Sequence, residues 1–509
     1  MLGSTIAELL AVGDKADTAI AAPGVPPLSY ADLRHQVERT LLSLGRSGVG
    51  RGDRVALVLP GGAELATAFL GVAAGASSAP LNPAYRAEEF EFYLSDLAAR
   101  ALIVERGSQS PAREVAARLG ILVLELEPQP ENGAGAFSLS PSSGSLSSGR
   151  GGVLEYAQPE DVALLLHTSG TTSRPKLVPL SQRNITASAQ SIAQTLRLTP
   201  GDRGLNVMPL FHIHGLMAGL LAPLHAGGTV FCTPGFNALR FFALMSEARP
   251  TWYTAVPTMH QTILARAGHN RDIIAANPLR FVRSSSSSMP PQVIGELEDT
   301  FGAPLIESYG MTEAAHQMAS NPLPPARRIP GTVGLAAGPE IAIMEEQGNL
   351  LEAGATGEIV IRGPSVMQGY QNNPSANADA FCNGWFRTGD QGTKSAEGYV
   401  TITGRLKEII NRGGEKISPR EVDEVLMDHP SIRQVVTFAV PHDKLGEDVA
   451  VAVVLREGVT LAEKDVREFA MKRLADFKVP RKVIFLDEIP KGPTGKLQRI
   501  GLAAKLGLG

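Results

Sequence analysis

The chain has 509 residues, of which 43% are hydrophobic and 19% are charged. This length exceeds what a single compact core ordinarily holds, so we expect more than one folded unit. The net charge of −4, from 47 basic and 51 acidic residues, argues against a protein that coats nucleic acid, and we expect no nucleic-acid partner. Two distant cysteines cannot form a disulfide framework or a zinc cluster, which favours a reducing compartment.

No segment reads as a signal peptide or a membrane span. Residues 1–10 contain Glu8 and lack a basic region followed by an apolar one. The uncharged stretch 65–85 is interrupted by Gly and Pro, so we expect a buried helix running into a strand. The chain ends in Leu-Gly-Leu-Gly, which is no peroxisomal address. We therefore expect a cytoplasmic protein, with a peroxisomal location left open.

Strand-like apolar runs alternate with helical stretches in the first part of the chain. Strands are predicted at 54–59, 101–105 and 161–166, and a helix is predicted over 64–75. This alternation favours an α/β architecture with largely parallel sheets. Residues 138–152 are rich in Ser and Gly and are predicted to form a flexible surface loop.

The composition changes near residue 400, after a predicted strand at 398–403. The last hundred residues read as a small α+β domain, so we expect a domain boundary between 403 and 404. The elements expected in this domain are helices over 419–427 and 461–474 and strands over 434–440, 449–455 and 482–486.

The segment His167–Lys176, with the sequence HTSGTTSRPK, directly follows a predicted strand. Between Thr168 and Ser173, five of the six side chains are hydroxyls and the sixth residue is Gly170. Such a loop can turn several N–H groups inward as an anion nest, with Lys176 as a cation. This pattern indicates a polyphosphate site, although it is not a Walker A loop. An ordinary Ser/Thr turn is the alternative.

Two further segments carry groups that suit a nucleotide. In Tyr309–Glu313, an aromatic ring can stack on a purine, a hydroxyl can bind phosphate and a carboxylate can hold Mg²⁺. In Trp385–Asp390, a carboxylate after a Gly turn can accept both hydroxyls of a ribose. The alternatives are a strand end with nothing bound and a simple turn.

The last two segments lie in the predicted C-terminal domain. Gly404–Lys407 and Arg412–Pro419 contain glycines, which permit a hinge or a close approach to a ligand. Pro490–Arg499 places Lys496 on a loop rich in Gly and Pro. A lysine in such a loop is ordinarily solvated, but a small separate domain could bring it into a site.

In this combination and order, these segments resemble the adenylate-forming superfamily of acyl-CoA synthetases, firefly luciferases and the amino-acid-activating domains of peptide synthetases. The resemblance covers nearly the whole chain. Within the group, the chain is most similar to plant and fungal oxalate–CoA ligases, which are themselves close to 4-coumarate–CoA ligases. That match rests on HTSGTTSRPK, PLFHIHGL, TWYTAVPTMHQ, the serine run after Phe281-Val282-Arg283, and YGMTEAAHQMASNPLP.

The resemblance implies a large N-terminal adenylation domain, 1–403, of parallel-type sheets with helices and a β-subdomain. A hinge at Lys407 would join it to a mobile C-terminal domain, 404–509. The implied activity is ATP-dependent ligation of oxalate to coenzyme A through an oxalyl-adenylate, with Mg²⁺, yielding oxalyl-CoA, AMP and pyrophosphate. We expect a monomer that takes a small carboxylic acid.

The resemblance also implies roles for individual residues. The β- and γ-phosphates would be held by Thr168, Ser169, Gly170, Thr171, Thr172 and Lys176. The adenine, α-phosphate and metal would be held by Glu307, Ser308, Tyr309, Gly310, Met311, Thr312 and Glu313, with Glu313 on the metal. Asp390 and Arg405 would hold the ribose, and Gly413 and Gly414 would meet the pantetheine arm of coenzyme A. Lys496 would contact both the α-phosphate and the substrate carboxylate and reduce their repulsion.

Oxalate carries a second carboxylate, so its pocket needs a small volume and hydrogen-bond donors or positive charge. The candidates are His212, His214, Ser286, Ser288 and His316. Each His could instead be a hydrogen-bonded core residue, and the serine run could be a tight loop. The run Ser284–Ser288 is unbroken, where the similar ligases have a mixed Ser/Cys/Ala stretch, so residue assignments there are open.

Two other functions remain as alternatives. The chain could be a ligase for a 4-coumarate-like or medium-chain acid. It could also be a non-catalytic nucleotide-binding protein, which Glu313, Asp390 and Lys496 argue against, because a simple binder does not need the lysine.

Overall fold

The computed structural model describes residues 4–142, 155–168, 175–490 and 499–508. Two compact units are present. Unit 1 contains the described residues up to 168 together with 176–340 and 362–379. Unit 2 contains Pro175, 341–361 and the residues described from 380 onward. A boundary between 403 and 404, and movement about it, stay predictions.

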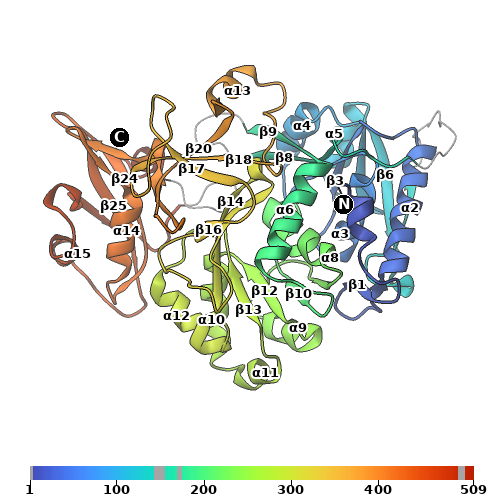
Figure 1. Cartoon of the computed structure of the whole chain (residues 1–509), viewed down its shortest axis with the longest axis horizontal. Helices are drawn as coiled ribbons and strands as arrows, with labels where there is room; N and C mark the ends of the chain where they lie inside the picture. The colour runs from blue at the N-terminus through green and yellow to red at the C-terminus, as the bar shows by residue number, and fades with distance from the viewer. Residues whose placement is uncertain (1–3, 143–154, 169–174, 491–498, 509) are drawn as a thin grey trace. The chain divides into compact units, whose positions relative to one another are not determined.

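Unit 1 contains a seven-stranded sheet with parallel strands in its middle (Figure 1). Its strands, in spatial order, are β7 (Phe137–Pro141), β6 (Leu122–Pro128), β5 (Ala101–Glu105), β3 (Arg54–Val58), β4 (Ser77–Pro80), β8 (Val162–Thr168) and β9 (Lys176–Ser181). Only β7 and β9, at the two edges, pair antiparallel with their neighbours. The strands predicted at 54–59, 101–105 and 161–166 are therefore β3, β5 and β8.

Helices cover this sheet because its strands are apolar on both faces. Ala56 and Val58 of β3 pack against α4 (Ala87–Asp96) and α5 (Ala112–Arg118). Val55 and Leu57 alternate to the opposite face and are also buried. The helix predicted over 64–75 is α3 (Ala63–Ala73), which is buried almost all round and is followed by the buried strand β4. Within the described ranges, no helix is long and apolar enough to span a membrane.

One predicted loop is partly a strand. Residues 138–141 belong to β7, which pairs antiparallel with β6 so that Leu139 lies opposite Leu126. Local composition favoured a loop, whereas pairing with β6, the preceding strand in the chain, supplies the backbone hydrogen bonds that stabilise β7. Residues 143–152 of the predicted loop lie outside the described residues.

Unit 1 also contains a nine-stranded sheet. Its strands, in spatial order, are β16 (Leu335–Ala336), β15 (His316–Ser320), β14 (Leu305–Met311), β13 (Phe281–Ser284), β12 (Trp252–Ala255), β10 (Arg203–Asn206), β11 (Thr229–Cys232), β1 (Thr18–Ala21) and β2 (Leu28–Ser29). The six strands from β14 to β1 pair parallel, and the remaining three pair antiparallel.

Helices α9 (Phe241–Ala248), α10 (Pro257–Ala267) and α12 (Pro291–Phe301) pack on one face of this sheet (Figure 1). Tyr253 and Val282 belong to that apolar face. Their neighbours Thr254 and Arg283 alternate to the opposite face, where they are register partners on adjacent strands. The sheet therefore carries polar side chains on the face away from these three helices.

Unit 2 contains two five-stranded sheets. The first consists of β17 (Glu340–Met344), β18 (Thr356–Arg362), β20 (Trp385–Lys394), β19 (Phe381–Cys382) and β21 (Val400–Arg405). The second consists of β23 (Glu415–Ile417), β22 (Ile410–Arg412), β25 (Gly446–Leu455), β24 (Ile432–His442) and β26 (Lys482–Phe485). Within the second sheet, only the β25–β26 pair is parallel.

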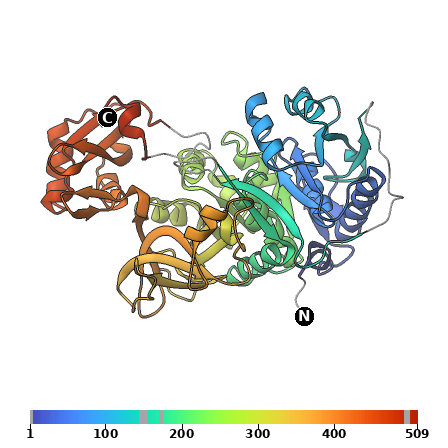
Figure 2. The same cartoon turned by 90° about the horizontal axis from the view of Figure 1, so that it is seen from above.

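The second sheet is apolar on both faces because β25 carries a continuous run of apolar residues, whose side chains point alternately to the two faces. Figure 2 draws this part of the chain in orange to red. Val449, Val451 and Val453 of β25 pack with α14 (Pro419–Met427) and α15 (Glu463–Met471). Ala450 and Ala452 pack on the other face with α16 (Leu502–Lys505). The two helices and three strands predicted for this region are all present, and the predicted α/β fold class is confirmed.

Candidate active site

The predicted phosphate loop joins two paired strands of unit 1. Thr168 ends β8 and Lys176 begins β9, and the two residues are register partners. The hydroxyl of Thr168 donates a hydrogen bond of 3.4 Å to the carbonyl of Lys176. The hairpin thus fixes both ends of the loop. Ser169, Gly170, Thr171 and Thr172 lie outside the described residues.

A tyrosine links this hairpin to the predicted metal ligand. The Nζ atom of Lys176 lies 4.5 Å from the ring centroid of Tyr370, which is a cation–π contact. The Tyr370 hydroxyl donates a hydrogen bond of 2.9 Å to Oε1 of Glu313. The carboxylate is 7% exposed. Two motifs that lie far apart in the sequence therefore share one side chain, and sequence reasoning did not find it.

Backbone hydrogen bonds hold Tyr370 in this place. The N–H of Met367 donates to the carbonyl of Glu313 over 2.8 Å, and the N–H of Gln371 donates to the carbonyl of Leu177 over 2.9 Å. The segment 367–371 is thereby bonded to both motifs. No periodic pattern or motif in the sequence marks it, because its role depends on these long-range pairings.

The motif Tyr309–Glu313 lies on a tight antiparallel connection. Residues Glu307 to Met311 belong to β14, Thr312 and Glu313 begin a single 3₁₀ turn, and β15 follows at His316. Gly310 is required here, because a Cβ at this position would lie 1.7 Å from the carbonyl oxygen of His316. The ring of Tyr309 is 9% exposed. Its role against adenine stays a prediction.

Three of the five predicted substrate residues meet in one buried cluster. Nδ1 of His214 lies 3.1 Å from Oγ of Ser286, and the rings of His214 and His316 stack with centroids 4.8 Å apart. Arg283 bonds to both rings: its Nη1 lies 3.3 Å from Nε2 of His214, and its Nη2 lies 3.2 Å from Nε2 of His316. Sequence reasoning gave Arg283 no role of its own. A charged residue inside an otherwise apolar strand was the feature that could have marked it as functional.

Both histidines of the cluster are neutral. Burial lowers the pKa of His214 well below the usual 6.5, and the nearby His316 and Arg283 lower it further. The pKa of His316 also lies well below 6.5, because burial lowers it and the charge of Arg283 lowers it further. The cluster therefore offers hydrogen bonds from the two rings and one positive charge, on Arg283.

The other two predicted substrate residues lie at exposed positions. His212 is the N-cap of α7 (Ile213–Leu216), and its ring centroid lies 4.7 Å from that of Phe211. Ser288 is exposed in the loop after β13, and no hydrogen bond joins it to the cluster within the described ranges. Their role in substrate binding stays a prediction.

In unit 2, the predicted ribose residues form an ion pair. Nε of Arg405 lies 2.8 Å from Oδ1 of Asp390, and the two residues are register partners on β21 and β20. The sequence predicted that Asp390 follows a turn, which is wrong. The strand β20 continues through Gly389 because it pairs with β18 and β21 on either side. Gly389 has a φ of 74°, which marks an irregularity, and its N–H donates to the side-chain Oε1 of Glu358 over 2.9 Å.

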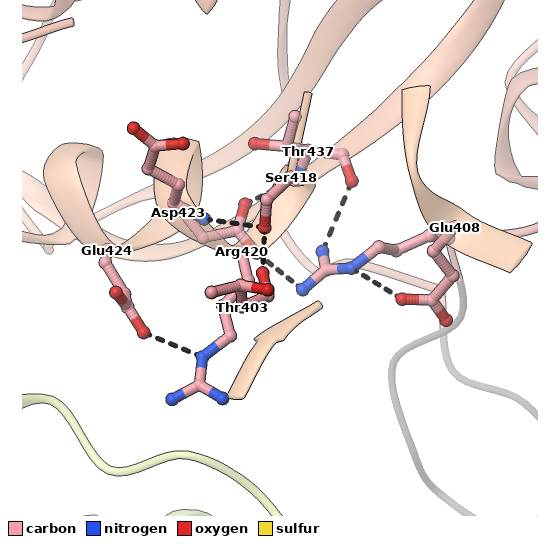
Figure 3. Close-up of polar contacts among 9 residues, drawn as sticks. Thr403, Glu408, Ser418, Arg420, Asp423, Glu424 and Thr437 are labelled. Carbon is pink, nitrogen blue, oxygen red and sulfur yellow. Dashed lines mark hydrogen bonds and ion pairs between the residues drawn. The ribbon is translucent and has the colours of Figure 1, made fainter. Parts of the chain in front are cut away.

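The predicted hinge is followed by a cluster of charges within unit 2. Lys407 is exposed in a 3₁₀ turn, Leu406–Glu408. Figure 3 shows Glu408, Asp423 and Thr437 around one guanidinium, which belongs to Arg499. Its distances are 3.2 Å to Glu408, 2.7 Å to Asp423 and 3.2 Å to the carbonyl of Thr437.

Arg499 therefore joins the residue after Lys407 to α14 and β24. It also directly follows the segment 491–498, which contains Lys496 and lies outside the described residues. Gly413 and Gly414 form the exposed turn between β22 and β23, with φ values of 60° and 99°. These values favour glycine at both positions.

Two family models match the chain. The model for the AMP-binding enzyme matches residues 12–371, and the model for the AMP-binding enzyme C-terminal domain matches residues 421–496. The chain belongs to the family of AMP-binding enzymes. The resemblance to the adenylate-forming superfamily, inferred from the motifs, is confirmed.

Individual members of this family are similar over almost the whole length. A protein of Humulus lupulus described as a probable CoA ligase, CCL9, is 48% identical over 94% of this chain and 92% of its own. An oxalate–CoA ligase of Arabidopsis thaliana is 46% identical over 94% of both chains, and one of Saccharomyces cerevisiae is 40% identical over 93% of this chain and 91% of its own.

Among solved structures, ATP-bound MatB from Rhodopseudomonas palustris superposes with a TM-score of 0.88 at 29% identity. The match covers 99% of this chain and 98% of MatB. This family member supports the fold described above over both units.

Proposed function

We propose that the protein is an ATP-dependent ligase that joins oxalate to coenzyme A. The observation that carries this proposal is the buried polar cluster around His214 and His316. An aromatic or medium-chain acid needs apolar walls, whereas a small diacid needs donors and positive charge. The similarity to the oxalate–CoA ligases of Arabidopsis thaliana and Saccharomyces cerevisiae supports the same substrate.

The proposed reaction has two steps. A carboxylate oxygen of oxalate attacks the α-phosphorus of ATP, the bond to the β-phosphate oxygen breaks, and pyrophosphate leaves. The sulfur of coenzyme A then attacks the activated carbonyl carbon, its thiol proton goes to solvent, and AMP leaves. The mixed anhydride replaces a very poor leaving group with a good one, so one hard step becomes two easier ones.

In the proposed assignment, the loop 168–176 holds the β- and γ-phosphates, with Lys176 as a cation. Thr312 binds the α-phosphate, and residues 307–311 hold the adenine. Asp390 and Arg405 hold the ribose. These roles follow from the family motifs. The contacts of Tyr370 with Lys176 and Glu313 support the phosphate-binding role of Lys176, because they bring its motif together with the motif that contains Glu313.

The residues around Glu313 fit Mg²⁺. The described part of the chain contains no cluster of three or more His, Cys, Asp or Glu side chains that could hold a metal alone. Mg²⁺ commonly takes one or two carboxylates and completes its shell with water and substrate phosphates, so a single buried carboxylate suits it. When bound, the ion neutralises charge on the phosphates. Glu313 would hold it, and Tyr370 orients that carboxylate.

Lys496 is proposed to reduce the repulsion between the attacking carboxylate and the α-phosphate during the first step. Lys407 is the proposed hinge about which the C-terminal domain turns between the steps. Gly413 and Gly414 are proposed to approach the pantetheine arm of coenzyme A in the second step.

The test is a pyrophosphate-release assay with ATP, Mg²⁺ and, in turn, oxalate, 4-coumarate or octanoate. We expect release with oxalate, formation of oxalyl-CoA by mass spectrometry once coenzyme A is added, and loss of release in Lys496→Ala. Release with coumarate or octanoate, and none with oxalate, contradicts the proposal. Binding of ATP without release for any acid favours the non-catalytic alternative.

A further inference from the structure

Arg283 is a buried cation without a counter-ion among the described residues. Its side chain is 0% exposed. The ion pairs of the described ranges do not include it, and no acidic group contributes to the pKa of its guanidinium, which burial alone lowers to about 9. Its Nε atom is buried without a hydrogen-bond partner. Burying a charge in this way is costly, so a structural role alone does not account for it.

Among the described residues, every group that hydrogen-bonds to the guanidinium is neutral. Nη1 contacts Oγ1 of Thr254 at 3.3 Å and Nε2 of His214 at 3.3 Å. Nη2 contacts Nε2 of His316 at 3.2 Å and Oε1 of Gln317 at 3.1 Å. These contacts hold the guanidinium in place without neutralising it. The positive charge therefore remains available to a ligand.

The contacts also determine which ring nitrogens carry protons. A guanidinium can only donate hydrogen bonds, so Nε2 of His214 and Nε2 of His316 both accept. Each neutral ring then carries its proton on Nδ1. The Nδ1–H of His214 donates to Ser286, over 3.1 Å. No described residue bonds to Nδ1 of His316, so this N–H is a donor that none of the residues in the described ranges uses.

The backbone at this cluster is strained at the residues that would meet a ligand. Ser286 has a φ of 74° and His316 has a φ of 92°. Such values are uncommon for residues other than glycine and persist only where the surroundings enforce them. Both residues belong to the cluster, and His316 follows Glu313 by three positions. One of the two strained residues is therefore three positions along the chain from the carboxylate proposed to hold Mg²⁺.

We propose that Arg283 makes the enzyme select doubly charged acids, because the second carboxylate of the bound acid is the missing counter-ion and is contacted by Nδ1–H of His316. This inference rests on the proposed function and adds the residue that sets its substrate class. Arg283 is a positioning residue, since it supplies charge and fixes the two ring tautomers, whereas His316 contacts the substrate.

The test compares oxalate with oxamate, in which a neutral amide replaces one carboxylate at nearly the same size. We expect kcat/KM of the wild-type enzyme to be higher for oxalate than for oxamate. In Arg283→Met, the ratio of these two kcat/KM values should fall about 100-fold, mainly because KM for oxalate rises. KM for ATP should stay near the wild-type value, and KM for oxamate should rise much less than KM for oxalate. The matched control is Arg266→Met, which removes an exposed positive charge on α10. An unchanged oxalate-to-oxamate ratio in Arg283→Met overturns the proposal.

A second variant covers the case in which Arg283→Met does not fold. Gln317→Glu places a carboxylate of nearly equal shape against Nη2 of Arg283 and so supplies a counter-ion from the protein, at the loss of the bond that the Gln317 amide donates to the carbonyl of Ala337 over 2.9 Å. We expect it to weaken oxalate binding and to leave oxamate turnover in place. A melting temperature near that of wild type identifies a folded variant, and unchanged oxalate KM in that folded variant contradicts the proposal.

The same assays separate this inference from the proposed function. If wild type does not activate oxalate, the proposed function is wrong. The role of Arg283 is then decided with malonate and its monoamide. A preference for malonate that Arg283→Met removes supports the inference, and activity restricted to singly charged acids overturns it.

Discussion

The hydroxyl of Tyr370 donates a hydrogen bond of 2.9 Å to Glu313, and the ring of the same tyrosine lies 4.5 Å from Nζ of Lys176. One side chain therefore orients the proposed metal ligand and positions a proposed phosphate cation. Glu313 is 7% exposed, so few water molecules can replace the hydroxyl as a donor. The relationship predicts that nucleotide binding depends on Tyr370.

Tyr370→Phe keeps the ring beside Lys176 and removes only the hydroxyl. We expect KM for ATP in the presence of Mg²⁺ to rise about tenfold, because a buried hydrogen bond to a charged group is lost. Tyr370→Leu removes the cation–π contact as well and should raise KM further. The measurement is pyrophosphate release at varied ATP with saturating acid. Equal KM values for wild type and Tyr370→Phe would show that the hydroxyl is not used.

The binding of the acid should depend on pH in a defined direction. Both cluster histidines have pKa values well below 6.5, so they stay neutral from about pH 6.5 upward. Burial lowers the pKa of Arg283 to about 9, and above that pH its positive charge is lost. We expect KM for oxalate to be flat between about pH 7 and 8 and to rise through pH 9.

The control for this pH profile is KM for oxamate, which lacks the second charge and should rise much less over the same range. A rise of equal size for both acids would assign the pH effect to another group. The two profiles are measured with one enzyme preparation in overlapping buffers.

The stability of the protein should fall in mild acid. His214 and His316 are neutral when folded, whereas in the unfolded chain they bind protons near pH 6.5. Below that pH the unfolded state binds more protons, so the free energy of unfolding decreases as the pH falls. We expect the melting temperature to drop between about pH 6.5 and 5, and to drop less in His316→Asn. Parallel curves for the two proteins would contradict this assignment.

Arg499 should be important for the stability of unit 2. It bonds to Glu408, Asp423 and Thr437 (Figure 3), and its loss would leave the Asp423 carboxylate buried without its cation. Breaking a buried ion pair in this way costs about 3 kcal/mol, so we expect Arg499→Met to unfold unit 2 at lower denaturant concentration. The matched control is Arg456→Met at an exposed position. Equal unfolding midpoints for the two variants would contradict the prediction.

Much of the fold was predictable because its signals are local. Apolar runs at 54–59, 101–105 and 449–455 predicted strands that the structure contains. Strand pairing is not visible in the composition of a short segment, so β7 was predicted as a loop and Asp390 was placed after a turn. In both cases pairing with the strand next to it in the chain, β6 for β7 and β21 for β20, supplies the backbone hydrogen bonds.

The sequence by itself determined the family, the α/β class and the segments that carry the chemistry, since motif spacing and hydrophobic period are properties of neighbouring residues. Only the tertiary structure decided which of those side chains meet. Tyr370 reaches Glu313, and Arg283 reaches His214 and His316, through strands brought side by side by sheet pairing. Charge without a counter-ion can be recognised only from the neighbours in space, and these come from far along the chain.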